Sequence, residues 1–135
     1  MNNMKFHHIS LVSKNLDAAA AFYCNVLGLA EFERPAFPIA GRWLRVGTVE
    51  VHLIDRSDGT FRVSATVDYN DIHFALRVPD FEAAISHFKK CGYHESETKG
   101  EEKRLRINRS GKAGYPQVFL MDPDNHIIEV NAAQL

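Results

Sequence analysis

Four residues of the types that bind transition metals lie in apolar surroundings typical of strands. His8 and His73 each begin an apolar run, and His52 and Glu129 each lie between two aliphatic residues. A carboxylate buried in such a strand is costly unless it has a partner. Two or three imidazoles and one carboxylate are suitable ligands for a divalent transition metal. We therefore expect a metal site built from these four residues, with Glu129 as its only carboxylate.

The four residues occupy matching places in an internal repeat. The segment 71–88 matches the segment that begins at His8 when it is shifted by 65 positions (73 − 8). The other matched pairs are Leu11 with Leu76, Leu16 with Phe81, Asp17 with Glu82, and Tyr23 with Phe88. His52 and Glu129 lie 77 positions apart (129 − 52), and the extra 12 positions fit a longer loop in the second copy. A period of this length indicates two copies of one supersecondary unit.

Each copy predicts the same order of elements, β-α-β-β-β, from its hydrophobic periodicity. In the first copy, strands are expected at 5–12, 29–34, 42–46 and 49–55, with a helix between an N-cap at Asn15 and a stop at Gly28. In the second copy, strands are expected at 72–78, 93–97, 117–121 and 126–131, with a helix between Asp80 and Gly92. Part of the loop 98–116 could also pair as a strand around 105–108. The predicted fold class is α+β, with two βαβββ modules at 4–56 and 71–135. A polar linker at 57–70 joins them within one domain of 135 residues.

Composition excludes several classes of protein. The formal net charge of −1 gives no bulk attraction to nucleic acid or to an anionic membrane. No apolar run approaches the ~20 residues of a membrane span, and the first residues, MNNMKFHH, lack the apolar core of a signal peptide. Two cysteines, Cys24 and Cys91, are too few for a disulfide framework. We expect a cytoplasmic domain with a small-molecule substrate and no nucleic-acid or membrane partner.

Two further groups of residues are candidates for contact with substrate. Three aromatic residues near predicted strands could line an apolar cavity or simply belong to the core: Phe37, Trp43 and Phe61. A basic run near a predicted loop consists of Arg104, Arg106, Arg109 and Lys112. This run is either a solvated face balanced by nearby glutamates or a grip for a substrate carboxylate, for which Arg109 and Lys112 are the candidates.

Three segments resemble the vicinal oxygen chelate superfamily, which contains glyoxalases, bleomycin-resistance proteins and dioxygenases. They are FHHISLVSKNLDAAAAFYCNVLGL at the start, IHFALRVPDFEAA in the middle and FLMDPDNHIIEV at the end. The resemblance implies two modules whose curved mixed sheets enclose a metal-binding cavity, with ligands from the first and last strands of each module. The matching positions are His8, His52, His73 and Glu129. It also implies a homodimer with one divalent metal per site, Zn or Ni being favoured and Fe, Mn or Co possible.

His52 narrows the function that the resemblance implies. The stretch WLRVGTVEVHLID is similar to a glyoxalase-like branch with histidine at the second ligand position, where glyoxalase I usually has glutamate. Ring-cleaving dioxygenases of the superfamily use only two histidines and one glutamate. Four ligands imply a redox-silent, glyoxalase-like lyase or isomerase that acts on vicinal oxygens through an enediolate, with Glu129 as the catalytic base. The alternatives are an iron(II) ring-cleaving dioxygenase, a drug-binding protein of the bleomycin-resistance type, and thiol transfer to an antibiotic epoxide.

Overall fold

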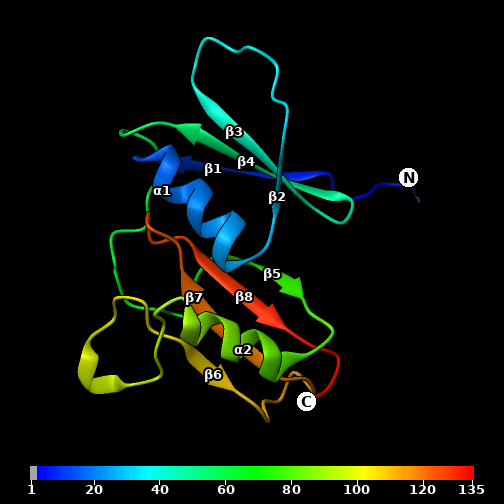
Figure 1. The fold of residues 1–135 in the computed structure, drawn as a ribbon, viewed down its shortest axis with the longest axis vertical. Helices are drawn as coiled ribbons and strands as arrows, with labels where there is room; N and C mark the ends of the chain where they lie inside the picture. Colours follow the sequence, from blue (N-terminus) through cyan, green and yellow to red (C-terminus); the bar gives the residue numbers. More distant parts are fainter. Residues whose placement is uncertain (1–2) are drawn as a thin grey trace. The chain divides into compact units, whose positions relative to one another are not determined.

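A computed structural model describes residues 3–135, which form two compact units that divide after Phe61. Each unit contains one sheet of four strands and one main helix (Figure 1). The first unit runs β1 (His8–Ser13), α1 (Leu16–Ala21), a π-helical turn (Phe22–Val26), β2 (Ala30–Phe32), β3 (Gly41–Val46) and β4 (Val49–Asp55). The second runs β5 (His73–Arg77), α2 (Phe81–Lys90), a 3-10 turn (Glu97–Lys99), β6 (Arg106–Asn108), β7 (Gln117–Met121) and β8 (Ile127–Asn131).

The two sheets have the same topology, which confirms the predicted βαβββ repeat. Their strand orders are β1-β4-β3-β2 and β5-β8-β7-β6. In each unit the first strand lies parallel to the last, and the other neighbours are antiparallel. A parallel pair requires a long crossover connection, and the helix and two further strands supply it. The first and last strands, which carry the candidate ligands, are therefore neighbours in both sheets.

The registers of the two parallel pairs place the candidate ligands equivalently. His52 on β4 lies opposite Ser10, two residues after His8. Glu129 on β8 lies opposite Ala75, two residues after His73. Side chains two residues apart on a strand share one face of the sheet. In each unit, the histidine of the first strand and the candidate ligand of the last strand therefore lie on the same face.

Both helices begin at the predicted caps. The side chain of Asn15 accepts a hydrogen bond from the amide of Ala18 at 3.0 Å, and Asp80 accepts one from Ala83 at 2.9 Å. The first helix widens after Ala21 into the π-helical turn, and the chain then leaves it at Gly28, whose φ is +75°. No helix within residues 3–135 is both long enough and apolar enough to cross a membrane.

One predicted strand is wrong. The segment 93–97 was expected to pair, but its only ladder contact is a single bridge between His94 and Arg104. The 3-10 turn follows it, and β6 takes the place in the second sheet that β2 holds in the first. The sequence from Glu95 onward is polar and has no alternating apolar residues. It therefore has no apolar side chains that could be buried by forming a strand at the edge of the sheet.

The face of each sheet that carries no candidate ligand is apolar and supplies the core. In the first unit Leu44, Val51 and Leu53 are at most 1 % exposed and pack on the side of α1. The corresponding buried residues of the second unit are Val118, Leu120, Ile128 and Val130 on the strands and Phe81, Ile85 and Phe88 on α2. Because alternate residues of each strand face the helix, the remaining ones are free to build a site on the opposite face.

Candidate metal centre

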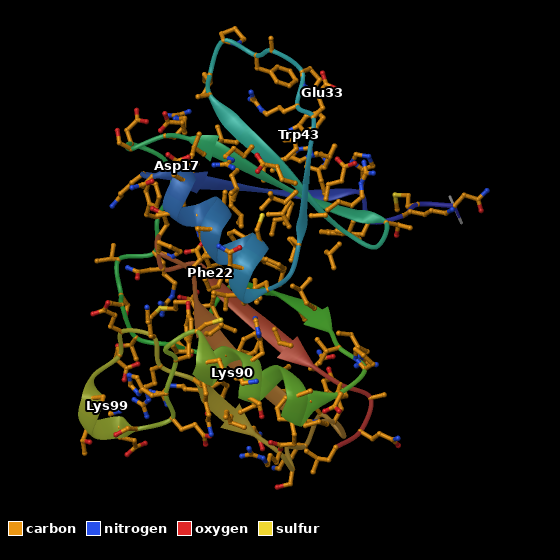
Figure 2. The ribbon with its side chains drawn as sticks, in the orientation of Figure 1. Asp17, Phe22, Glu33, Trp43, Lys90 and Lys99 are labelled. Carbon is orange, nitrogen blue, oxygen red and sulfur yellow. The ribbon has the colours of Figure 1, made fainter. Side chains whose placement is uncertain are left out.

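In the first unit His52 lies between two other rings. The imidazole of His8 stacks on one side, with 4.3 Å between ring centroids and 16° between planes. The indole of Trp43 stacks with His52 at 4.3 Å and 11°, and it lies on β3 near the loop that contains Glu33 (Figure 2). The register explains the second contact, because Trp43 is paired with His52 across β3 and β4. His52 is buried, while His8 is exposed.

Glu50 fixes the orientation of the His52 ring. Its carboxylate Oε2 lies 2.9 Å from His52 Nε2, and its Oε1 accepts a hydrogen bond from Arg45 at 3.1 Å. The bond from His52, together with that from Arg45, holds the pKa of the Glu50 carboxyl below its usual range. A carboxylate only accepts hydrogen bonds, so Nε2 of His52 must carry the proton. In the neutral ring, the lone pair of His52 is therefore on Nδ1.

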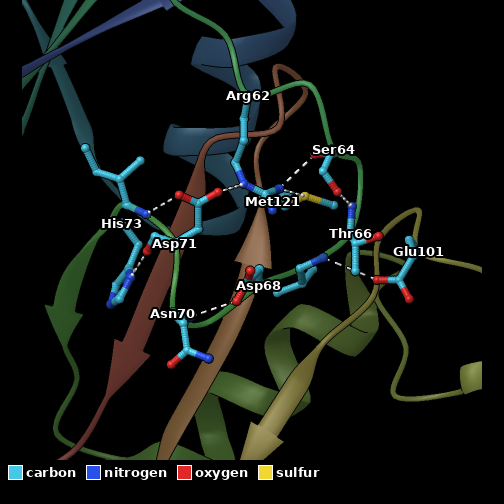
Figure 3. Close-up of polar contacts among 11 residues, drawn as sticks. Arg62, Ser64, Thr66, Asp68, Asn70, Asp71, His73, Glu101 and Met121 are labelled. Atoms are coloured by element: carbon cyan, nitrogen blue, oxygen red, sulfur yellow. Dashed lines mark hydrogen bonds and ion pairs between the residues drawn. The ribbon is translucent and has the colours of Figure 1, made fainter.

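In the second unit His73 faces Glu129. Nε2 of His73 lies 3.4 Å from Oε2 of Glu129, whose side chain is 6 % exposed. On the other side of the ring, Nδ1 lies 2.8 Å from the backbone oxygen of Asp71, and Arg62 donates to the Asp71 carboxylate at 2.6 Å (Figure 3). A backbone carbonyl only accepts, so Nδ1 of His73 carries a proton. Two groups with lone pairs, Nε2 and a carboxylate oxygen, then face one another unless a proton or a metal ion lies between them.

A hydrogen-bonded chain holds the other oxygen of Glu129. The amide nitrogen of Asn131 donates to Glu129 Oε1 at 2.7 Å. The amide oxygen of Asn131 accepts from Arg77 Nε at 2.8 Å, which fixes the orientation of the amide group. Asn131 itself is 5 % exposed. Oε1 is thus engaged by Asn131, and Oε2 is left to face His73.

The residues fit a divalent metal in chemistry. Histidines that bind metals usually donate their second ring N–H to a carbonyl or carboxylate, as His73 does to Asp71 and His52 does to Glu50. The structure brings together His8 with His52 in one unit and His73 with Glu129 in the other. Over the described residues 3–135, it contains no ready-made group of three or more His, Cys, Asp or Glu side chains placed to hold an ion. The four-ligand site therefore stays a prediction.

A cavity of about 740 Å³ opens over the ligand-bearing face of the second sheet. His73 and Glu129 line it, and Phe119 lies beside them with its ring edge-on to His73 at 5.4 Å. Its other walls include Arg104, Arg106 and the predicted substrate residue Lys112. The volume lies within the range of ordinary small-molecule pockets.

The first unit has a smaller cavity, of about 360 Å³, beside His52. Phe37 and Trp43, two predicted substrate residues, line it together with Ile39 and Ile54. The ring centroids of Phe37 and Trp43 are 6.0 Å apart. Arg34 contributes the one charged group, and its guanidinium lies 4.6 Å over the ring of Phe37. This pocket suits an apolar group next to the imidazole.

Two predicted substrate residues lie elsewhere. The ring of Phe61 lies 4.5 Å from the ammonium of Lys14 and does not line the pocket of Phe37 and Trp43. Arg109 forms a two-point ion pair with Glu82 of α2, at 2.6 and 3.1 Å, outside the lining of the larger cavity.

Sequence reasoning missed Glu50 and Asn131. Each stands two residues from a candidate ligand on the same strand, Glu50 before His52 and Asn131 after Glu129. Strand periodicity places such residues on the ligand face, and this signal could have identified both.

Comparison with known proteins agrees with the fold. Residues 7–108 match the model of the Glyoxalase/Bleomycin resistance protein/Dioxygenase superfamily. No curated protein matches the sequence. Three solved structures are similar: a protein assigned to the glyoxalase family from Bacillus anthracis (17% identity, TM-score 0.74, 98% of each chain), a lactoylglutathione lyase from Agrobacterium tumefaciens (20%, 0.68, 98% of this chain and 96% of that one), and a genomically encoded fosfomycin resistance protein from Listeria monocytogenes (16%, 0.71, 98% and 96%).

At these identities the solved structures establish the fold alone, whereas the family model covers most of the chain. The resemblance of the three sequence segments and the shared topology of the two sheets point the same way. The chain belongs to the Glyoxalase/Bleomycin resistance protein/Dioxygenase superfamily.

Proposed function

We propose that the chain is a divalent-metal-dependent lyase or isomerase of the glyoxalase type, acting on a small substrate with two neighbouring oxygens. The proposal depends mainly on one observation: Nε2 of His73 and Oε2 of Glu129 lie 3.4 Å apart, and both residues line a cavity. Nδ1 of His73 is committed to the Asp71 carbonyl, so a proton or a metal ion must lie between these two atoms, and the cavity gives a metal ion access to them. Members of the superfamily typically bind a divalent metal.

His8, His52, His73 and Glu129 would hold the metal. The bound ion would supply Lewis acidity at a pair of substrate oxygens, and Zn or Ni suits this redox-silent role. Glu129 is the base that takes a proton from the carbon next to a substrate carbonyl, because it is the only carboxylate among the four. Asn131 fixes its Oε1, which leaves the other oxygen directed at the cavity side of His73.

A second candidate function is supported by one contact. Glu50 occupies Nε2 of His52, and a site in which Nδ1 of His52 does not bind the metal would leave His8, His73 and Glu129 as donors. Two histidines and one carboxylate with open positions are the ligand set of non-haem iron(II) oxygenases. An iron(II) dioxygenase is therefore the competing function.

Elemental analysis of protein purified without chelator tests both functions. Zn, Ni or Co at one ion per site is the expected result, and iron with oxygen consumption in the presence of a catechol would support the dioxygenase. Protein that carries no metal and takes up none on addition of Zn²⁺ or Ni²⁺ would contradict both. Glu129→Gln should keep the fold and abolish proton exchange at the carbon next to a carbonyl, measured by NMR in D₂O with α-hydroxyketones. A fully active Glu129→Gln variant would refute the role of Glu129 as base.

We also propose a homodimer, the assembly that the resemblance implies. β1 and β5 are edge strands of their sheets and carry His8 and His73. Large apolar side chains next to these strands are exposed, Phe6 at 65% and Ile72 at 85%. In a dimer, the partner chain would cover these side chains. Light scattering at micromolar concentration should give twice the 15.3 kDa of one chain, and a monomeric mass would contradict the proposal.

A further inference from the structure

The cavity of the second unit has a positively charged end as well as a metal-binding end. Arg106, on β6, lies opposite Phe119 of β7, which in turn lies opposite Glu129 of β8. These three residues share one face of the sheet and all line the cavity. Neighbouring strands are about 4.8 Å apart, so the backbones of Arg106 and Glu129 are separated by two such steps, roughly 10 Å.

Arg106 has donors that the protein does not use. Over the described residues, four buried side-chain atoms have no hydrogen-bond partner, and Nε of Arg106 is one of them. Its nearest carboxylate is Glu101, at 3.9 Å from Nη2, and the side chain is 33% exposed. A buried donor without a partner is costly. The guanidinium lies in the wall of the cavity on a side chain that is 33% exposed, so its terminal N–H groups are available to an acceptor bound there.

The neighbouring arginine and the carboxylates at this end are already engaged. Arg104 pairs with Glu97 at 2.9 Å and with Glu101, and Glu101 also accepts from the amide of Val67 at 3.3 Å. Lys89 pairs with Glu95. Arg106 and Lys112 therefore remain as the weakly paired cations of this wall, and Arg106 is the one that lies in the register of Phe119 and Glu129.

Polar groups that suit an anion surround this end. Asn108 and Gln117 line the cavity, and they lie opposite one another in the register of β6 and β7. Amide groups and a guanidinium together can satisfy the oxygens of a carboxylate, which an arginine binds with two parallel hydrogen bonds. Phe119, between the two ends, gives an apolar surface for a short carbon chain.

We propose that Arg106 is the anion-binding residue of this cavity, and that the substrate carries a terminal carboxylate joined by a short carbon chain to its pair of vicinal oxygens. The inference rests on the proposed function for the vicinal-oxygen end, while the carboxylate end depends only on the described residues of the second unit. The carbon chain of the substrate would lie across the ring of Phe119, and its vicinal oxygens would lie at His73 and Glu129. Arg109, which the sequence suggested for this role, is held by Glu82 instead.

A matched pair of ligands tests the carboxylate end. 2-Hydroxyglutarate and 2-hydroxypentanoate have the same α-hydroxy acid end, and only the first has a second carboxylate. With metal-loaded protein, calorimetry should give a preference of about 10-fold or more for 2-hydroxyglutarate, since a hydrogen bond to a charged group carries this much discrimination. Arg106→Leu should remove the preference and keep the affinity for 2-hydroxypentanoate, Arg106→Lys should keep part of the preference, and Arg109→Leu should leave it unchanged. Equal binding of both ligands by the wild type, or a preference that survives Arg106→Leu, would overturn the proposal.

A metal-free measurement separates this proposal from the proposed function. In chelator-treated protein, titration with glutarate should shift the NMR signal of the Arg106 Nε–H group saturably, with the signal identified by its loss in Arg106→Lys. If the protein binds no metal but this shift occurs, the proposed function fails and the carboxylate site stands. If no saturable shift occurs, the carboxylate site is wrong whatever the metal content.

Discussion

Oε2 of Glu50 lies 2.9 Å from Nε2 of His52, and the two residues stand two positions apart on the same face of β4. The contact assigns the proton of His52 to Nε2 and leaves Nδ1 for a metal. In the proposed metal site, Glu50 would be the carboxylate that orients His52, an arrangement common in metal sites. The single histidine at which this chain departs from glyoxalase I is thus accompanied by a carboxylate of its own.

The Glu50–His52 contact predicts coupled effects on metal affinity. Glu50→Gln should weaken Co²⁺ binding by about 10- to 100-fold, because loss of an outer hydrogen-bond partner typically costs this much. The double variant Glu50→Gln/His52→Ala should bind no more weakly than His52→Ala alone. Competition titration with a chromogenic chelator gives the affinities. Arg45→Met, which removes the other partner of Glu50, is the control and should have a smaller effect. Tighter binding by Glu50→Gln would show that Glu50 competes with the metal for His52.

The Asn131–Glu129 contact predicts a second loss of affinity. Asn131→Leu keeps a similar volume but removes the donor that fixes Glu129 Oε1 and the acceptor for Arg77. We expect metal affinity to fall by about 10- to 100-fold and the free energy of unfolding to fall by about 1–3 kcal/mol. Gln117→Leu, opposite Asn131 on β7, is the control and should leave metal affinity unchanged. Chelator competition and urea unfolding of the metal-free protein measure the two quantities. Unchanged metal affinity in Asn131→Leu would show that Glu129 needs no such support.

The Glu31–Arg42 ion pair predicts a dependence of stability on pH. Arg42 donates to both oxygens of Glu31, at 2.7 and 2.6 Å, and these bonds hold the pKa of Glu31 below its usual range. A carboxyl with a lowered folded-state pKa stabilises the fold above its unfolded pKa of about 4.3, and this contribution disappears as the pH falls through the folded-state pKa.

Glu31→Gln should therefore be less stable than the wild type at pH 7, by at most about 1 kcal/mol because the pair is partly exposed. The difference should vanish in the acid range, below about pH 4. Urea unfolding at several pH values measures it, with Glu33→Gln, outside this ion pair, as the control. If the stability difference between Glu31→Gln and the wild type persisted unchanged to pH 2, the Glu31–Arg42 ion pair could not be its cause.

Gly41 predicts a steric effect on stability. A Cβ at this position would lie 2.5 Å from the carbonyl oxygen of Leu53 and 2.9 Å from Nε of Arg34. The first contact is with backbone of the paired strand β4 and cannot be relieved by a rotamer change. Gly41→Ala should lower the free energy of unfolding by about 1–3 kcal/mol, as overpacking usually does. Adding Arg34→Ala should not restore stability, and urea unfolding of both variants provides the check. A Gly41→Ala protein as stable as the wild type would show that β3 can move away from Leu53.

The sequence by itself determined the architecture and the places of the candidate ligands. The repeat that matches His8 with His73 survives as two sheets of identical strand order. Asn15 and Asp80 cap the helices as predicted. These features are local, because hydrophobic periodicity and capping depend on neighbours a few residues away. The one wrong strand, at 93–97, lies where that periodicity is absent.

Only the tertiary structure decided which polar groups act on those ligands. That Asn131 holds Glu129 and that Arg106, rather than Arg109, lines the cavity depends on the register between strands and on where each side chain finds a partner. Arg109 looks equivalent to Arg106 in the sequence, but Glu82 of α2 binds it. The Arg109–Glu82 pair joins residues 27 positions apart in the chain, so composition and spacing carry no record of it. The candidate ligands were visible in the sequence, and the hydrogen bonds that hold their side chains became visible only in the fold.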